Sequence, residues 1–300
     1  MDILNVVTRL RGGLYRCGQV ARALRGRVPA EEKEPDSPHQ QSVAVSLADR
    51  LCQEVLLLEA YEVAPGIEVY SEEIEACPPE ILGLFSSNHH RYALILDPID
   101  GTEDYIRGGP TYAHMVGLLD QPAGVMAASL IYFPEMARLY VGVRSMGAYC
   151  ADGLWGDLRP LTPTAVPRTV GEVKRLTASD REAFQHLGVQ IVPPQSASAA
   201  YELMRVARGE VGAMVMRHFH GHDMAIPGAI IQELGGAVLG GAGEPARFEK
   251  GMARMPLVVL SLSPDYAGEL VNELATRNPQ PSTKEAPHGE TLAYRGRRHN

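Results

Sequence analysis

The stretch YALILDPIDGTEDYI, residues 92–106, places two aspartates three positions apart at the end of an apolar run. The four residues before the first aspartate are all apolar, which is typical of a strand interior. We expect a sharp turn from Asp97 to Asp100, because Gly101 gives the backbone the freedom to turn. Two carboxylates at one strand end repel each other when both are ionised, so they need a cation, a proton or a basic partner.

The composition of the chain is that of an ordinary soluble globular protein. Its 300 residues can bury a large core, and they are 45% apolar and 21% charged. The net charge of -8 argues against a nucleic-acid polymer as partner, because proteins that bind one normally carry a basic face. It does not exclude a small phosphorylated substrate, since a bound cation can reverse the local charge.

Membrane spans, signal peptides and disulfides are not expected. No apolar run reaches the roughly 18 residues of a membrane span, and the first residues lack a signal-peptide pattern. We therefore expect a cytoplasmic protein without a membrane partner. The cysteines are scattered without a CxxC pair, which favours buried reduced thiols at Cys17, Cys52, Cys77 and Cys150.

The hydrophobic pattern predicts helices in the first 62 residues and then a run of strands. Helical spacing of apolar residues covers 3–25 and 43–62. Strands are expected near 67–70, 92–96, 113–119, 124–133 and 138–143.

A change in composition at 152–170, which is rich in Pro, Gly and Thr, indicates a domain junction. Beyond it, strand-like and helix-like pieces alternate up to residue 276, which indicates layers of helix and sheet. We expect an N-terminal α+β domain at 1–155 that carries the metal-binding motifs and a C-terminal α/β domain at 156–277. The polar tail at 278–300 is expected to be disordered.

Asp97, Asp100 and Thr102 form the first candidate site. Oxygen ligands without a nearby Cys or His suit Mg²⁺ or Mn²⁺ better than zinc. The alternative is a structural turn in which Asp100 or Thr102 caps the following helix.

Two further acidic segments bear on this site. Glu72 and Glu73 follow a short predicted strand, and Asp223 lies at the expected N-terminus of an apolar helix. The alternative interpretations are a solvated turn for the two glutamates and a helix N-cap for Asp223. Taken together, the acidic segments follow one another in a recognisable order.

The chain resembles the inositol monophosphatase family of Mg²⁺-dependent, lithium-sensitive phosphatases over residues 43–274. LDPIDGT (96–102) matches the most specific signature of the family at every position, and SEE (71–73) matches its metal-binding glutamate motif. HDMAIPGAIIQELGG (222–236) matches the last signature in the spacing from its aspartate to its Gly-Gly pair. SVAVSLADRLCQEVLLLEAY is similar to the first long helical segment of the family, and IYFPEMARLYVGVRSMGAYCADG is similar to its hairpin. The resemblance implies an α/β fold, a layered α/β/α/β/α sandwich of the inositol monophosphatase and fructose-1,6-bisphosphatase type.

The resemblance also implies a role for each acidic residue. A first Mg²⁺ would be held by Glu72, Asp97 and the Ile99 carbonyl, and a second by Asp97, Asp100 and Asp223, so that Asp97 bridges the two. Asp49 would bind a third, weaker ion or its waters. Glu73 would contact the metal ligands without binding an ion itself. The catalytic residues implied are Glu72, Asp97 and Thr102, of which Thr102, paired with Glu72, would position the attacking water.

Substrate contacts follow from the same resemblance. Backbone amides of Gly101 and Thr102 would bind the phosphate at a helix start. The full set of implied substrate contacts is Asp100, Gly101, Thr102, Ser198, Met216, Arg217, His220 and Asp223.

Some positions depart from the inositol-specific pattern. Met216 stands where inositol-specific members tend to carry a glutamate that reads ring hydroxyls, and His222 replaces a frequent Trp. The stretch MRHFHGHD (216–223) is either an ordinary packing segment or a specificity patch, in which Phe219 or a histidine stacks on a ring and Arg217 meets a second phosphate. Glu-Asp-Tyr at 103–105 is closer to the nucleotidase and histidinol-phosphate branches.

The expected function is Mg²⁺-dependent hydrolysis of a small sugar, cyclitol or nucleotide phosphate monoester by a metal-activated water, in a homodimer. Alternatives within the family are a 3'(2'),5'-bisphosphate nucleotidase and a histidinol-phosphate phosphatase. A haloacid-dehalogenase-type phosphatase does not fit, because its two aspartates are two residues apart, whereas Asp97 and Asp100 are three residues apart. A catalytically inert metal- or nucleotide-binding module is the alternative from another class. Against it, the chain has all five principal site residues, Glu72, Asp97, Asp100, Thr102 and Asp223.

Overall fold

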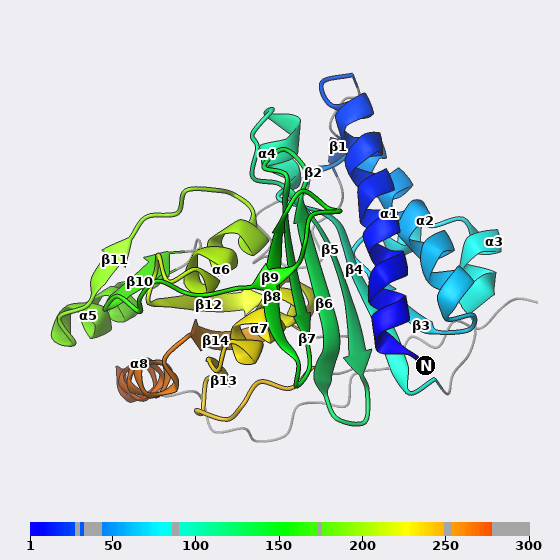
Figure 1. The fold of residues 1–300 in the computed structure, drawn as a ribbon. Coiled ribbons are helices and arrows are strands. Elements are labelled where there is room, and N and C mark those ends of the chain that lie inside the picture. The colour runs from blue at the N-terminus through cyan, green and yellow to red at the C-terminus, as the bar shows by residue number, and fades with distance from the viewer. Residues whose placement is uncertain (28–30, 33–43, 86–89, 173–175, 249–253, 278–300) are drawn as a thin grey trace, which may run out of the picture.

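The fold consists of alternating layers of helices and β-sheets (Figure 1). This computed structural model describes residues 1–27, 31–32, 44–85, 90–172, 176–248 and 254–277. An outer helix pair, a seven-stranded sheet, a middle helix pair, a five-stranded sheet and a second outer pair follow one another in that order. The predicted α/β/α/β/α architecture is therefore confirmed.

The first outer layer consists of α1 (Ile3–Leu24) and α2 (Leu47–Val63). α1 begins after Asp2, whose carboxylate accepts hydrogen bonds from the first backbone amides of the helix. Leu14 and Leu56 are fully buried in the core that both helices share with the seven-stranded sheet. The short elements around this layer are β1 (Glu31–Glu32), β2 (Ala44–Val45), η1 (Ile74–Ala76), α3 (Pro79–Leu82) and η2 (Gly83–Phe85).

The strands of the seven-stranded sheet lie side by side in chain order. Only β3 and β4 pair in parallel, and the other neighbours are antiparallel. β4, β5 and β6 are buried on both faces, which explains why their sequences are apolar runs without alternation. The strands are β3 (Glu68–Ser71), β4 (Tyr92–Asp100), β5 (Ala113–Asp120), β6 (Val125–Phe133), β7 (Arg138–Val143), β8 (Gly147–Asp152) and β9 (Arg159–Pro160); the short helix α4 (Thr102–Ile106) follows β4.

The middle layer is formed by α6 (Ala199–Ala207) and α7 (Gly221–Glu233). Leu203 of α6 and Ile230 of α7 are fully buried in one core that also contains side chains of both sheets. This layer lies between the sheets and joins them into one body (Figure 1).

The five-stranded sheet has the order β11-β10-β12-β14-β13. Its outer face is covered by α5 (Ala178–His186) and α8 (Pro264–Arg277), which bury Phe184 and Leu270 against it. The strands are β10 (Thr169–Glu172), β11 (Gln190–Val192), β12 (Ala213–Phe219), β13 (Ala237–Gly240) and β14 (Met255–Ser261).

β4 contains a β-bulge at the two aspartates of the central motif. Asp97 pairs with Met115 of β5 and Asp100 pairs with Ala113, so three steps along β4 face two steps along β5. The predicted turn over these residues is therefore wrong: the strand continues to Asp100, and the chain turns at Gly101, whose φ is 79°.

The bulge decides which way the two carboxylates point. Side chains alternate along a strand, so residues three apart normally lie on opposite faces. One extra residue restores the same face. In agreement, Ile95 lies in the core shared with the middle helices, whereas Ile99 lies in the core on the α1 and α2 side. Both aspartates therefore point toward the middle layer.

Most of the predicted elements are present with shifted ends. β8 was not predicted as a strand, although its residues alternate between half-buried and buried positions from Gly147 to Cys150. The seven-stranded sheet extends to Pro160, and residues 161–168 lead to the second sheet, so the division into domains near 155 stays a prediction. The tail at 278–300 lies outside the described residues. Within the described chain, no helix has the length and apolar character needed to cross a membrane.

Gly101 offers a test of this packing. A Cβ added to Gly101 would lie 2.8 Å from the Ser198 Cβ, in addition to the strain of a positive φ. We expect Gly101→Ala to lower the free energy of unfolding by about 3 kcal/mol, from backbone strain and overpacking together. Gly235→Ala is the matched control, since its φ of 85° is similar and no atom lies within 4 Å; it should cost about 1 kcal/mol. Equal losses in urea titrations would contradict the close approach.

Candidate active site

Glu72 and Asp97 come together because β3 and β4 run in parallel. Ser71, the last residue of β3, pairs with Leu96. Glu72 and Asp97, the residues that follow this last pair, are therefore neighbours at the carboxyl end of β3, while β4 itself continues to Asp100. Glu72 is exposed, and Glu73 is buried with its carbonyl accepting a hydrogen bond from a side chain of α2 at 2.8 Å.

Asp97 is buried and has four other carboxylates near enough to act on its charge. It is 2% exposed, and its Oδ1 has no hydrogen-bond partner among the described residues. Burial raises the pKa of Asp97 well above its usual range, and neighbouring carboxylates add to the effect. These neighbours are, in decreasing order, Glu72, Asp100, Asp223 and Asp49.

Asp49 reaches the site from the first turn of α2. Its Oδ2 accepts hydrogen bonds from the backbone amide and hydroxyl of Ser46, at 2.8 and 2.6 Å. Its Oδ1 lies 3.2 Å from the Thr102 hydroxyl, which also lies 3.0 Å from the Ile99 carbonyl. Burial raises the pKa of Asp49 to about 7, although the bonds from Ser46 lower it. Asp49 therefore orients Thr102 directly.

Asp100 is held by the N-terminus of α6. Its carboxylate accepts hydrogen bonds from the Ser198 hydroxyl and from the backbone amides of Ala199 and Ala200, the latter two at 3.1 and 2.9 Å. Burial raises the pKa of Asp100 to about 7, and the Ser198 hydrogen bond opposes this rise. Asp100 therefore joins the end of β4 to the middle layer.

Asp223 lies in the first turn of α7, two residues after Gly221. Its charge raises the pKa values of Asp97 and Asp100, so it lies within electrostatic range of both. Pro227 lies inside the same helix and has no N–H to donate to the Asp223 carbonyl four residues earlier. The start of α7 therefore adds one more carboxylate to the electrostatic cluster around Asp97 and Asp100.

The donor chemistry of this cluster fits a hard divalent cation. All of the acidic groups supply oxygen, the ligand that Mg²⁺ prefers, and the unpartnered Oδ1 of Asp97 is a buried acceptor. Within the described residues, however, no three His, Cys, Asp or Glu side chains lie close enough to hold one ion together. The carboxylates influence one another's pKa values because Coulomb forces act over longer distances than metal coordination.

The residues implied as substrate contacts fall into two groups. Ser198 lies against Asp100, as described above, and His220 is the N-cap residue directly before α7. Met216 is fully buried in the core between the sheets. Arg217 donates two hydrogen bonds to Asp180 of α5, at 2.8 and 2.6 Å, because alternation along β12 turns it to the opposite face from Met216. The guanidinium group of Arg217 thus binds a carboxylate on the outer side of the second sheet.

His114 is a buried polar residue near the site that sequence reasoning missed. It lies in β5 opposite the bulge, is fully buried, and its Nδ1 forms a short hydrogen bond with the Pro98 carbonyl. A carbonyl accepts, so Nδ1 carries the proton. Burial lowers the pKa of His114 to about 4. A histidine inside the apolar run AHMVGLL was the available signal, because buried polar groups in a strand normally have a specific partner.

The lowered pKa of His114 predicts a pH-dependent contribution to stability. An unfolded histidine takes up a proton near pH 6.5, whereas the folded His114 does so only near pH 4. The unfolded state therefore gains protons first, and stability is lost as the pH falls from 6.5 to 4, by about 3 kcal/mol. We expect urea titrations of the wild type to lose this amount relative to His114→Asn.

His186→Asn is the control for this experiment. The His186 side chain is 64% exposed, so this variant should follow the wild-type pH dependence. Parallel stability curves for His114→Asn and the wild type would contradict a neutral buried His114.

Comparisons of the whole sequence with known proteins identify relatives of one family. The family model described as "Inositol monophosphatase family" matches residues 12–277. Human inositol monophosphatase 2 is 27% identical over 240 residues, which are 77% of this chain and 78% of that protein. A histidinol-phosphatase of Chlorobaculum parvum is 32% identical over 117 residues, 39% of each chain.

A solved structure shares the fold. An IMPase/NADP phosphatase complexed with Mg²⁺ and phosphate superposes with a TM-score of 0.69 at 17% identity, over 91% of this chain and 97% of that chain. The family model covers nearly all of the described residues, and the layered fold is shared with this solved structure. The chain belongs to the inositol monophosphatase family.

Proposed function

We propose that this chain is a Mg²⁺-dependent phosphatase that hydrolyses a small-molecule phosphate monoester. The observation that carries the proposal is the cluster of acidic groups around Asp97, whose buried Oδ1 has no partner among the described residues. Such a concentration of negative charge is compatible with binding an anionic phosphate only if cations compensate it. Family membership supports the same reaction class.

The acidic residues would hold two or three Mg²⁺ ions. We assign Glu72, Asp97 and the Ile99 carbonyl to one, Asp97, Asp100 and Asp223 to a second, and Asp49 to the surroundings of a third. When bound, Mg²⁺ supplies positive charge for the phosphate and lowers the pKa of a water molecule. Relatives of this fold include one solved with Mg²⁺ and phosphate, which supports the choice of ion.

The chain's own groups orient the reactants. The Thr102 hydroxyl, held by Asp49 and the Ile99 carbonyl, is the group that we expect to position the attacking water, together with Glu72. Water adds to phosphorus while the bond to the ester oxygen breaks, and the leaving oxygen takes up a proton from the water. The products are inorganic phosphate and an alcohol. Backbone amides of Gly101 and Thr102 are the expected donors to the phosphate oxygens.

The surroundings of the site favour a substrate other than an inositol phosphate. Met216 offers no acceptor for a ring hydroxyl, and it is fully buried. Histidinol phosphate is a second candidate, because a histidinol-phosphatase is among the relatives and the Glu-Asp-Tyr at 103–105 resembles that branch. The homodimer and the cytoplasmic location stay predictions.

Phosphate release tests the proposed reaction. Unaided monoester hydrolysis is extremely slow, so the ions and their ligands supply most of the barrier reduction. We expect release from p-nitrophenyl phosphate with Mg²⁺, and a loss of at least about 100-fold in kcat for Asp97→Asn and Asp223→Asn. Asp265→Asn on the exposed side of α8 is the control. Wild-type release no faster than background would reject the phosphatase, and inositol phosphate, histidinol phosphate and 3'-phosphoadenosine 5'-phosphate compared by kcat/KM would rank the substrates.

Binding of Mg²⁺ should compete with protons. The pKa values of Asp49 and Asp100 are raised to about 7 by burial, so the metal-free protein retains these protons below pH 7 and loses stability as the pH rises through 7. Mg²⁺ must displace the protons at low pH, so its affinity should fall about tenfold per pH unit below 7 for each proton displaced. We expect a larger rise in Tm on adding Mg²⁺ at pH 8 than at pH 5.5, and no such difference for Asp97→Asn. A pH-independent shift would argue against carboxylate ligands.

A further inference from the structure

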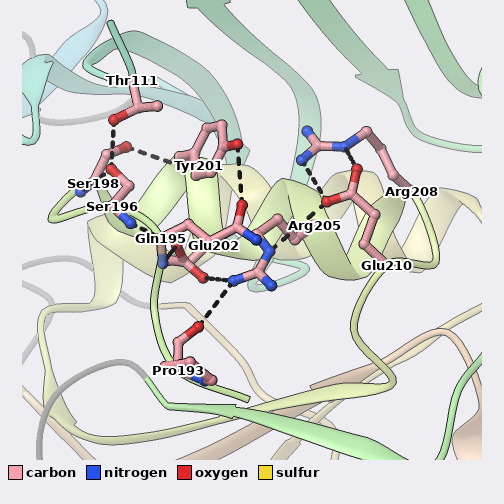
Figure 2. Close-up of polar contacts among 10 residues, drawn as sticks. All are labelled: Thr111, Pro193, Gln195, Ser196, Ser198, Tyr201, Glu202, Arg205, Arg208 and Glu210. Carbon is pink, nitrogen blue, oxygen red and sulfur yellow. Dashed lines mark hydrogen bonds and ion pairs between the residues drawn. The ribbon is translucent and has the colours of Figure 1, made fainter. Parts of the chain in front are cut away.

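Glu202 of α6 is a fully buried carboxylate that the proposed chemistry does not use. The Glu202 side chain is 1% exposed, and that of Arg205, its partner one turn later, is 3% exposed. The Arg205 guanidinium donates to Glu202 Oε2 at 2.6 Å (Figure 2). A buried ion pair of this kind is often no more stabilising than apolar residues of the same volume, so helix stability alone does not account for it.

The second oxygen of Glu202 binds the loop that leads into α6. Glu202 Oε1 accepts hydrogen bonds from the backbone amides of Gln195 and Ser196, at 2.7 and 2.9 Å. Arg205 also reaches this loop, with Nη1 at 3.4 Å from the Pro193 carbonyl. Figure 2 shows that both members of the pair face the loop. The pair therefore fixes the backbone of residues 193–196 against the helix.

From Ser196, the contacts lead directly to the acidic site. The Ser196 hydroxyl accepts a hydrogen bond from the Ser198 amide at 2.9 Å and lies 2.7 Å from the hydroxyl of Thr111, which lies in the loop between α4 and β5 (Figure 2). The Ser198 hydroxyl in turn donates to Asp100, as do the next two backbone amides. A chain of short contacts thus links Glu202 to a proposed metal ligand.

We propose that Glu202 is a positioning residue, which holds the segment Ser196–Ser198 against Asp100 and so fixes the place of the substrate beside Ser198. Only the kinetic part of this inference rests on the proposed phosphatase function. The acceptor oxygen of Glu202, rather than its charge, is the part that acts, because both loop amides bind the same oxygen.

Two matched double variants separate the acceptor from the charge. E202Q/R205M removes both charges but keeps an acceptor oxygen, and E202L/R205M removes the acceptor as well. Neither leaves an unpaired buried charge, which would destabilise the fold strongly. Glu210→Gln is a further control. Glu210 pairs with Arg208 and, at 3.7 Å, also with Arg205 (Figure 2), so this variant removes a charge beside Arg205 but leaves the Glu202 oxygen that binds the loop amides.

Hydrogen exchange of the full chain without metal is the first measurement. In E202L/R205M, the amides of Ser198, Ala199 and Ala200 should exchange at least tenfold faster than in the wild type. In E202Q/R205M and Glu210→Gln, they should stay within threefold. Equal exchange in the two double variants would overturn the proposal.

Kinetics with p-nitrophenyl phosphate and Mg²⁺ are the second measurement. E202L/R205M should raise KM at least tenfold and change kcat less than threefold, whereas E202Q/R205M should leave both within threefold. A fall in kcat at unchanged KM would overturn the assignment to substrate positioning. If the wild type released no phosphate, the proposed function would fail, and the exchange experiment would still judge the role of Glu202.

Ser196→Ala covers the case in which E202L/R205M does not fold. This substitution removes the hydroxyl that accepts from the Ser198 amide, at a partly exposed position. Faster exchange of the Ser198 amide by at least threefold supports the chain of contacts, and unchanged exchange there overturns it.

Discussion

Repulsion among buried carboxylates is the constraint on which the rest of this structure depends. Asp49, Asp97 and Asp100 are all less than a tenth exposed, and the charges of Glu72 and Asp223 act on them. Such groups persist in a fold only when protons, hydrogen-bond donors or cations compensate them. Two of the three have their own donors: Ser46 binds Asp49, and the start of α6 binds Asp100. Asp97 has one oxygen without such a donor among the described residues, so the described hydrogen bonds leave this buried oxygen uncompensated.

Four elements of the fold bring the five acidic residues to this place. Parallel pairing of β3 and β4 brings Glu72 beside Asp97, and the bulge in β4 turns Asp100 to the same face as Asp97. The first turns of α2 and α7 supply the remaining two. A site built from four elements needs those elements to be fixed relative to one another, and the middle helix layer and the Asp100 hydrogen bonds do so.

The sequence allowed the layers and the acidic cluster to be predicted, because both leave local signals. An apolar run, a helical periodicity and the LDPIDGT motif are each formed by residues that are close together in the sequence. The bulge left no such signal, since an extra residue in one strand is defined only by the register with its partner. The contacts of Arg217 depend on which face of β12 it occupies. The sequence indicated this face only through the alternation of side chains, which places Arg217 opposite to its neighbour Met216. The role of Glu202 could not be predicted either, because its acceptor bonds join residues whose proximity depends on how the loop folds back on α6.

The middle helices have a consequence for how the chain unfolds. α6 and α7 contribute to one hydrophobic core that contains residues of both sheets. Separating the sheets would expose the apolar surface of these helices to water, at a cost of about 25 cal/mol for each Å². We therefore expect the two halves to unfold together, and we expect cleavage in the segment 161–168 to release no pair of independently stable fragments. A partner or a denaturant that loosens one sheet acts on the other through the same pair of helices.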